Sequence, residues 1–202
     1  MNRHINTGGK MKILVTVAAT LLGLLLIGLI VMYSGMINVS ALEPSSGFTR
    51  WILHTTMDRS VDVRGEDLPA PDLTNEDMIR EGGEHYVHMC QGCHGAPGVE
   101  DTELAKGLEP RAPHLFKRRD PEDFNAGEAF WVTKNGIMMT SMPAWGRTHS
   151  DQKIWDIVAF LKKLPELSPE EYNQIMNEAK SEPMEMEEHS VTEHNMHEEY
   201  EK

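Results

Sequence analysis

The chain has 202 residues, enough for one domain of ordinary size with further segments on either side. Its formal net charge is −13, which argues against a nucleic-acid-binding protein because such proteins need basic side chains to neutralise phosphates. The charge is uneven: residues 1–42 carry +3, residues 43–165 carry −6 and residues 166–202 carry −10. An acidic central region favours protein partners with basic docking surfaces.

The chain begins with an apolar segment that predicts a transmembrane helix over residues 13–36. No charged residue occurs from Ile13 to Tyr33, and about 20 apolar residues are enough for a helix to cross a bilayer. A helix of a soluble protein would show a polar face, and this segment has none. A cleaved signal peptide is the alternative, but the apolar part of a signal peptide is typically about 7 to 15 residues long. An uncleaved anchor is therefore the favoured interpretation.

Basic residues on one side of this segment predict its orientation. Arg3, Lys10 and Lys12 precede it, whereas the first basic residue after it is Arg50. The positive-inside rule then places residues 1–12 in the cytoplasm and everything after the span on the outer, periplasmic side of the cytoplasmic membrane.

Residues 37–73 are expected to link the anchor to a globular domain. Apolar side chains at helical spacing predict a short amphipathic helix here that ends near Arg59 and includes Phe48, Trp51, Ile52 and Thr55. This helix is expected to pack on the globular domain; a position at the membrane interface, where Trp is favoured, is the alternative. Residues 61–73 contain two prolines and predict an extended linker.

Residues 74–165 carry helical patterns without a convincing strand pattern, and they predict an all-α domain. The predicted helices cover residues 75–89, 126–135 and 151–164. Thr74 is placed to cap the first helix, and Gly136 to end the second. Residues 95–125 are rich in Gly, Pro and charge and predict loops with short helical turns at most.

Both cysteines of the chain fall in one run, Cys90-Gln91-Gly92-Cys93-His94. A Cys-x-x-Cys-His run is the attachment signature of c-type haem. Two thiols three positions apart on a helical turn each add to a haem vinyl group, and the next residue presents its imidazole to the iron. The run therefore predicts one haem c, attached through Cys90 and Cys93, with His94 as an iron ligand. Haem of this type is attached outside the cytoplasmic membrane, in agreement with the predicted orientation.

Other functions of paired cysteines fit the pattern less well. A thioredoxin-like dithiol requires a βαβ environment, whereas the flanking segments are predicted to be helix and loop. A structural zinc site normally has four ligands, and the chain has no second cysteine pair. A structural disulfide between Cys90 and Cys93 is the last alternative, and such a short loop gains little stability from closure.

Residues 74–165 resemble a class I cytochrome c. In that family, a helix that ends in the attachment run crosses a C-terminal helix, through a small residue and then an aromatic residue one turn later. Gly82 and Tyr86 match these two positions, and residues 156–163 resemble the C-terminal helix, with Phe160 as the aromatic partner. The resemblance implies the class I cytochrome c fold, preceded here by a single transmembrane helix. It is closer to membrane-anchored monohaem cytochromes of bacteria than to the mitochondrial members, whose lysine-rich docking face this acidic domain lacks.

The resemblance also implies partners for His94 and the iron. A loop proline of the family offers its carbonyl to the other nitrogen of the proximal histidine; Pro113 matches it best, and Pro110 is the alternative. The sixth iron ligand is expected from the loop after Gly136, where Met142 matches the axial methionine of the family. The other candidates in this loop are Met138, Met139 and His149.

Other side chains near these positions are given ordinary roles. Trp131 and Trp145 are expected to line the haem pocket. His85 and His88 are expected at the surface, and Lys117-Arg118-Arg119 in a solvated loop.

Residues 166–202 contain 12 acidic and 2 basic residues and predict a disordered acidic tail. Histidines and methionines lie among its glutamates. Imidazole and thioether groups suit copper, so a copper site is the alternative interpretation of this tail.

Together these features predict an electron carrier and not an enzyme: a membrane-anchored monohaem c-type cytochrome that passes single electrons between respiratory-chain partners. No general acid–base pair or nucleophile accompanies the haem run, so neither a small-molecule substrate nor a nucleic-acid partner is expected. The alternatives are a cytochrome subunit of a larger oxidoreductase and a haem sensor with a labile sixth ligand.

Overall fold

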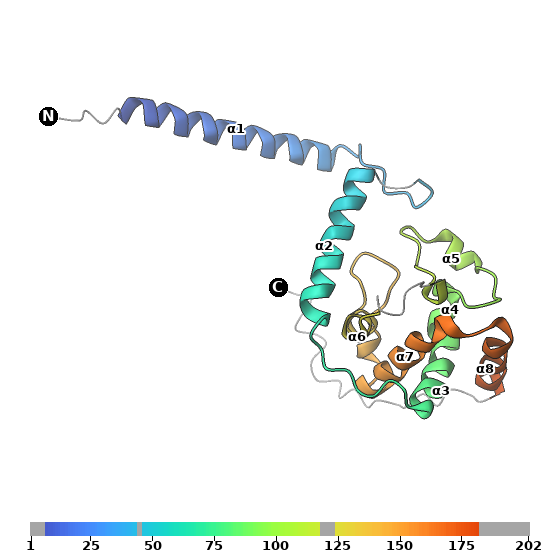
Figure 1. Cartoon of the computed structure of the whole chain (residues 1–202). Helices are drawn as coiled ribbons and strands as arrows, with labels where there is room; N and C mark the ends of the chain where they lie inside the picture. Colours follow the sequence, from blue (N-terminus) through green and yellow to red (C-terminus); the bar gives the residue numbers. More distant parts are fainter. Residues whose placement is uncertain (1–6, 44–45, 118–123, 182–202) are drawn as a thin grey trace, which may run out of the picture. The chain divides into compact units, whose positions relative to one another are not determined.

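The computed structural model describes residues 7–43, 46–117 and 124–181. The chain forms two compact units, Met1–Ser40 and Ala41–Lys202. The described residues form helices joined by loops, with no β-strand among them (Figure 1). The predicted all-α fold class is therefore confirmed.

The first unit contains one long helix, α1 (Thr7–Tyr33), drawn in blue in Figure 1. Its segment Gly9–Tyr33 has 25 residues and a mean hydropathy of 2.8, and no part of its most apolar window is buried. At about 1.5 Å per residue this segment is about 37 Å long, more than the ~30 Å apolar core of a bilayer. The helix is therefore long and apolar enough to cross a membrane. It ends earlier than predicted, before Gly35, whose φ is +71°.

The second unit begins with α2 (Gly47–Gly65), which is longer than predicted. It continues until Gly65 lies against the backbone of α6 (Ala126–Asn135), where a Cβ on Gly65 would lie 2.6 Å from the Glu128 Cα atom. Residues 61–65, expected in the extended linker, are therefore helical, because packing against α6 stabilises this last turn. The expectation that the helix packs on the globular domain is confirmed for its C-terminal part.

Two helices form the centre of the second unit, α3 (Glu76–His85) and α7 (Asp151–Lys163). Asn75 caps α3 by accepting a hydrogen bond from the amide of residue 77 at 2.9 Å. Thr74, the predicted cap, instead donates its hydroxyl to a neighbouring carboxylate. Ser150 caps α7, because its hydroxyl oxygen accepts a hydrogen bond from the Lys153 amide at 3.4 Å.

The crossing of α3 and α7 is close because Gly82 faces it. A Cβ at this position would collide with the carbonyl group of Asp156. One turn later, Tyr86 and Phe160 are both fully buried, and their ring centroids lie 5.3 Å apart. The small residue and the aromatic residue that the resemblance implied therefore meet at this helix crossing, seen between the green and orange helices of Figure 1.

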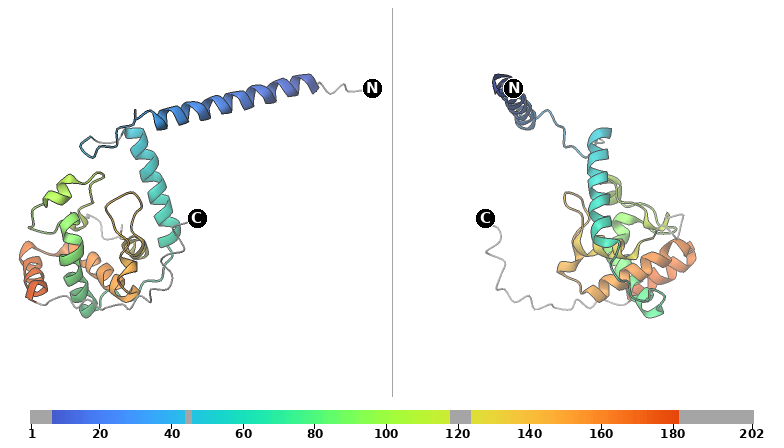
Figure 2. Two further views of the ribbon diagram at one scale, coloured as in Figure 1. Left: turned by 180° about the vertical axis from the view of Figure 1, so that it is seen from behind. Right: turned by 60° about the vertical axis from the view of Figure 1, so that its left-hand side comes forward.

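A second cluster of apolar side chains joins α6 to α7. Phe130 of α6 stacks on Trp155 of α7 at a centroid distance of 4.2 Å. The shorter elements are a π-helical turn at Tyr86–Cys90, α4 (Gln91–His94), α5 (Glu103–Gly107) and 3₁₀ turns at Leu115–Lys117, Trp145–Arg147 and Leu164–Glu166. The two views of Figure 2 show α6 and α7 on the side of the second unit that α2 joins.

The last described helix, α8 (Pro169–Ser181), corrects the prediction of disorder from residue 166 onward. Tyr172 is fully buried, Ala179 is 1% exposed, and the ring of Tyr172 stands edge-on to Tyr86 at 6.4 Å. Apolar side chains at helical spacing bury this face of α8, and the surrounding glutamates hid the pattern in the composition. The side chains packed on the core from this helix are Tyr172, Ile175, Met176 and Ala179.

Some predictions fall on parts of the chain outside the described residues. The copper hypothesis concerns histidines and methionines from Met184 onward, which lie outside the described residues. Arg118 and Arg119 of the predicted solvated loop also lie outside them. Of the basic loop, Lys117 is exposed, and its Nζ lies 5.2 Å from the centroid of the Phe116 ring.

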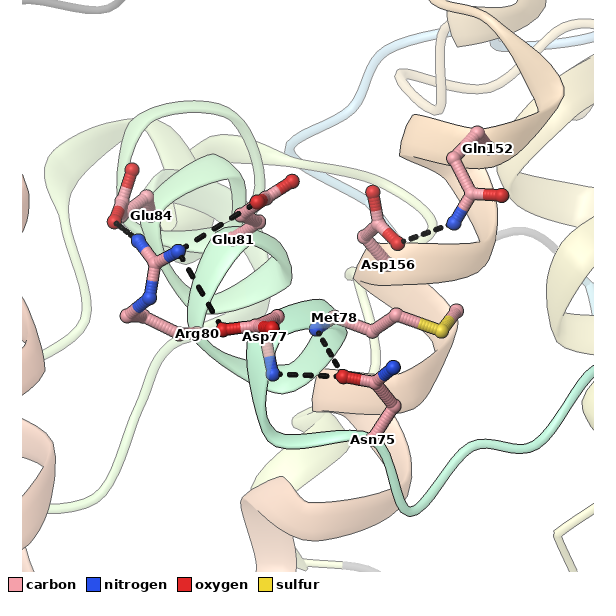
Figure 3. Close-up of polar contacts among 8 residues, drawn as sticks. All are labelled: Asn75, Asp77, Met78, Arg80, Glu81, Glu84, Gln152 and Asp156. Atoms are coloured by element: carbon pink, nitrogen blue, oxygen red, sulfur yellow. Dashed lines mark hydrogen bonds and ion pairs between the residues drawn. The ribbon is translucent and has the colours of Figure 1, made fainter.

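The carboxyl group of Asp156 is buried in the second unit. This residue is 2% exposed, and its Oδ1 accepts a 2.9 Å hydrogen bond from Gln152, one turn earlier on α7 (Figure 3). Burial raises the pKa of Asp156; the bond from Gln152 opposes this effect, and the nearby carboxylate of Glu81 adds to it. The ion pairs of Arg80 in the same view are solvent-exposed and contribute little to stability.

Gly82→Ala is expected to lower the free energy of unfolding by about 1–3 kcal/mol, because the added methyl group forces α3 away from α7. Urea unfolding followed by circular dichroism measures this loss. Gly107→Ala is the matched control, since Gly107 ends α5 and no atom lies within 4 Å of its added Cβ. Equal losses in the two variants would contradict a close crossing at Gly82.

Asp156→Asn is expected to stabilise the protein at about pH 8, and the gain should shrink toward about pH 4. The folded state raises the pKa of Asp156, so it binds this proton more tightly than the unfolded chain does. Stability is therefore lost as the pH rises through the folded-state pKa, and Asn resembles the protonated form. Urea midpoints across this pH range test the effect, with the exposed Asp67→Asn as control. A gain that does not change with pH would rule out titration of Asp156 as its cause.

Candidate haem site

The Cys90–His94 run lies at the end of a continuous helical path that starts with α3. A π-helical turn follows α3, in which the Gln91 amide bonds to the Tyr86 carbonyl, and α4 carries the rest of the run. Such turns inside helices are frequent at functional sites, because one extra residue rotates the side chains that follow. Gly95 then ends the helix with a φ of +67°. The run is therefore a single helical turn, whose orientation is set by the π-helical turn before it and by Gly95 after it.

Two hydroxyl groups hold this turn from outside. The Tyr86 hydroxyl donates to the Gly95 carbonyl at 2.6 Å, and the Thr102 hydroxyl donates to the Gly92 carbonyl at 2.5 Å. Burial raises the pKa of Tyr86, so its hydroxyl stays protonated and remains a donor. Thr102 also caps α5, which ties the next segment of the chain to the run.

The helix α8 touches the same turn from the other side. The Tyr172 hydroxyl donates to Gln91 Oε1 at 2.7 Å, and His88 Nε2 lies 3.0 Å from the Ala179 carbonyl. The sequence interpretation missed both contacts, because it placed this segment in a disordered tail. The helical spacing of the apolar side chains in α8 was the signal that would have found them.

His94 has the hydrogen-bond partner that the resemblance implied. Its Nδ1 lies 2.8 Å from the Pro113 carbonyl, which only accepts, so Nδ1 carries the proton and Nε2 is the nitrogen available to a metal ion. Burial lowers the pKa of His94; the bond to Pro113 opposes this effect, and nearby His114 adds to it. The neutral imidazole, which is the metal-binding form, is therefore favoured.

His114 fixes the loop that carries Pro113. Its Nε2 lies 3.3 Å from Asp101 Oδ1, and its ring stacks on Phe116 at a centroid distance of 5.4 Å. The Phe116 ring also closes over Gly95, where a Cβ would lie 3.2 Å from it. The loop is thus packed against the end of the attachment run.

The two cysteines are not disulfide-bonded; Cys90 is buried and Cys93 is half-buried. Burial raises the pKa of the Cys90 thiol to about 12. A redox-active dithiol needs a thiol of lowered pKa, so this environment argues against a thioredoxin-like function. The zinc alternative lacks a ligand set, since the described residues contain no group of three or more His, Cys, Asp or Glu side chains that would hold a metal ion.

Met142 lies in the loop after α6, and Gly136 makes this loop possible. Gly136 has a φ of +66°, and a Cβ there would lie 2.7 Å from the Met142 carbonyl. The Ile137 amide also donates to that carbonyl at 3.1 Å. Met142 is half-buried, whereas Met138 and Met139 are 89% and 94% exposed. Burial therefore separates Met142 from the other two methionine candidates.

A hollow of about 590 Å³ that is open to solvent borders this loop. Met142, Pro143 and Trp145 line it, and all of its lining in the described part of the chain comes from residues 135–148. Trp131, which was also expected to line a pocket, lies beside α2, with its ring 6.0 Å from the Arg64 guanidinium. The structure thus joins His94 to Pro113 and places Met142 in a separate loop.

His149, the last ligand candidate, is engaged with other side chains. Its ring stands edge-on to His85 and to Trp145, at 5.6 Å in both cases, and its Nδ1 lies 2.9 Å from the Thr148 hydroxyl oxygen. His85, expected at the surface, is half-buried beside His149. Burial lowers the pKa of His85 to about 4. His88 is exposed, as predicted.

The comparison with known families agrees with this geometry. Residues 77–161 match the family model described as cytochrome C oxidase, cbb3-type, subunit III. These residues form a class I cytochrome c domain. The match includes the attachment run, Pro113 and Met142, and it leaves α1, α2 and α8 outside. No curated protein sequence matches the chain.

A cytochrome c domain of this kind implies covalently bound haem c with iron, and hence an electron-transfer haem protein. The residues of the site fit such a group. The two thiols are free and lie on one helical turn, and the adjacent imidazole is bonded through Nδ1, which leaves Nε2 for the iron.

Removing the Tyr172 hydroxyl is expected to lower the stability of the protein without unfolding it. Tyr172→Phe should lower the free energy of unfolding by about 1 kcal/mol, because Gln91 Oε1 loses its donor. A double-mutant cycle with Gln91→Ala, measured by urea unfolding, should give a coupling energy of about 1 kcal/mol. Glu170→Gln, an exposed change on the same helix, should be additive with Gln91→Ala. Additivity of both pairs would contradict a contact between α8 and the run.

Proposed function

We propose that the chain is a membrane-anchored monohaem c-type cytochrome that transfers single electrons between respiratory-chain partners on the outer face of the cytoplasmic membrane. The hydrogen bond between His94 Nδ1 and the Pro113 carbonyl carries this proposal. It sets the orientation of the imidazole and strengthens Nε2 as a donor to iron. A histidine that follows two free thiols and is held in this way is suited to be the proximal ligand of an attached haem.

Each site residue then has one task. Cys90 and Cys93 form thioether links to one haem, which supplies one-electron chemistry through its ferrous and ferric iron. His94 and Met142 would hold the iron, and the Met142 thioether would favour the reduced iron and raise the potential. Pro113 orients His94. The hydroxyl groups that touch the run donate to backbone carbonyls, so they position the site and do not react.

The anchor adds a spatial constraint. With residues 1–12 in the cytoplasm and α1 across the bilayer, the cytochrome c domain lies on the outer face and diffuses only in the plane of the membrane. Confinement of this kind raises the effective concentration of a carrier near membrane-bound partners. The net charge of −6 over residues 43–165 favours partners with basic docking surfaces.

The second candidate is a cytochrome subunit of a larger oxidoreductase. The matching family model is described as an oxidase subunit, and this description favours a stable complex over a free carrier. Gentle solubilisation of membranes followed by affinity purification of the full chain separates the two. A stoichiometric partner that stays bound at high salt supports the subunit, whereas recovery of the chain alone supports the carrier.

Met142→Ala is expected to abolish the near-infrared sulfur-to-iron charge-transfer band of the oxidised protein. The midpoint potential should fall by on the order of 0.1 V, within the ~0.8 V range over which axial ligands set haem potentials. Spectroscopy and redox titration of the purified haem protein measure both effects.

Met138→Ala and Met139→Ala are matched controls for this variant, since both residues belong to the same loop and are exposed. Both should keep the band and the potential. Absence of the band in the unmodified protein, together with binding of carbon monoxide to the ferrous form, would contradict the carrier and support the haem sensor.

A further inference from the structure

The first turns of α2 expose a group of large apolar side chains, here called the α2 tip. It consists of Phe48, Trp51 and Ile52, which are 69%, 63% and 41% exposed. The ring centroids of Phe48 and Trp51 lie 6.1 Å apart, so the two rings form one continuous apolar surface. Figures 1 and 2 show this end of α2 standing clear of the other helices of the second unit. Ser46 caps the helix just before the tip.

The α2 tip faces away from the domain to which α2 belongs. At about 100° per residue, its three side chains fall within an arc of about 100° on the helix. Of the half-buried residues of α2, Met57, Ser60 and Val61 lie on the opposite side of the helix. Asp62 lies on the side of the tip and pairs with Arg59 of the same helix. The large exposed fractions of the tip side chains mean that residues of their own domain do not cover them.

The charge near the tip differs from that of the rest of the domain. From Gly47 to Met57 the only charged residue is Arg50, and the first acidic residue after the tip is Asp58. Trp, Phe and Leu with nearby basic residues are typical of helices at the interface between lipid headgroups and acyl chains. Two copies of a chain with a net charge of −13 repel each other, whereas the side chains of Trp and Phe are suited to the interfacial layer of a bilayer.

Chain length keeps the tip near a membrane. Residues 34–46 join the end of α1 to the start of α2, and these 13 residues extend to at most about 45 Å at about 3.5 Å each. If α1 crosses the bilayer, the tip is always within this distance of the bilayer surface. The local concentration of lipid around it is therefore high.

The other end of α2 is fixed to the domain. A Cβ on Gly127 of α6 would collide with the carbonyl group of Gly65, the last residue of α2. The helix therefore acts as a rigid connection between the tip and the cytochrome c domain. We propose that the α2 tip inserts into the interfacial layer of the membrane that α1 crosses. This second attachment limits the rotation of the domain relative to the membrane surface.

A nitroxide label at the tip tests this proposal in the full-length haem protein, reconstituted into nanodiscs of phosphatidylcholine with a fraction of anionic lipid. Ile52→Cys carries the label, so that Phe48 and Trp51 remain in place. The matched control is Leu104→Cys, an exposed apolar position on α5. Power-saturation spectra then compare collisions of each label with oxygen, which dissolves in lipid, and with a water-soluble nickel chelate.

The label at residue 52 is expected to be several-fold less accessible to the nickel chelate than the label at residue 104, and more accessible to oxygen. Replacing Phe48 and Trp51 with Ser should return it to the accessibility of the control. Equal accessibility of the two labels to the nickel chelate would overturn the proposal. Protection from both reagents would also overturn it, and would indicate a protein partner or a second copy. The readout does not depend on electron transfer or on the identity of the iron ligands.

Discussion

The close approach of α3 and α7 at Gly82 determines where the attachment run lies. Because a Cβ there would collide with the Asp156 carbonyl, the two helices are as near as their backbones allow. Tyr86, one turn further, then reaches Phe160 and also the carbonyl of Gly95, beyond the last residue of the run. A wider crossing would move the Tyr86 hydroxyl, and the turn that carries His94 would lose its hydrogen bond at Gly95.

The elements governed by local rules were predicted from the sequence. Gly136 ends α6 as expected, because a left-handed φ is a property of a single position. The cap of α3 was placed one residue too early, since Thr74 and Asn75 are both suitable and only the backbone geometry selects between them. The helix α8 was missed because its many glutamates made the segment resemble a disordered tail, although its apolar side chains recur at helical spacing and pack on the core.

In the site too, some contacts were predicted from the sequence, and others depend on the tertiary fold and were missed. The resemblance predicted the contact between His94 and Pro113, and the structure contains it. The role of Met142 as a ligand stays a prediction, although its burial distinguishes it from its neighbours. The donors Thr102 and Tyr172 are separated from their acceptors in the run by 10 and 81 positions. Hydroxyl groups at such separations carry no signal in the sequence, because their partners are set by the tertiary fold.

Two of the helices outside the family match, α2 and α8, pack against different parts of the proposed haem site. Through Gly65, α2 packs on α6, the helix that leads into the Met142 loop. On the other side, α8 bonds through Tyr172 to the run that carries His94. Among the described residues, α7 packs against both α3 and α6. Through α7, the helix that leads into the His94 run is therefore packed together with the helix that leads into the Met142 loop.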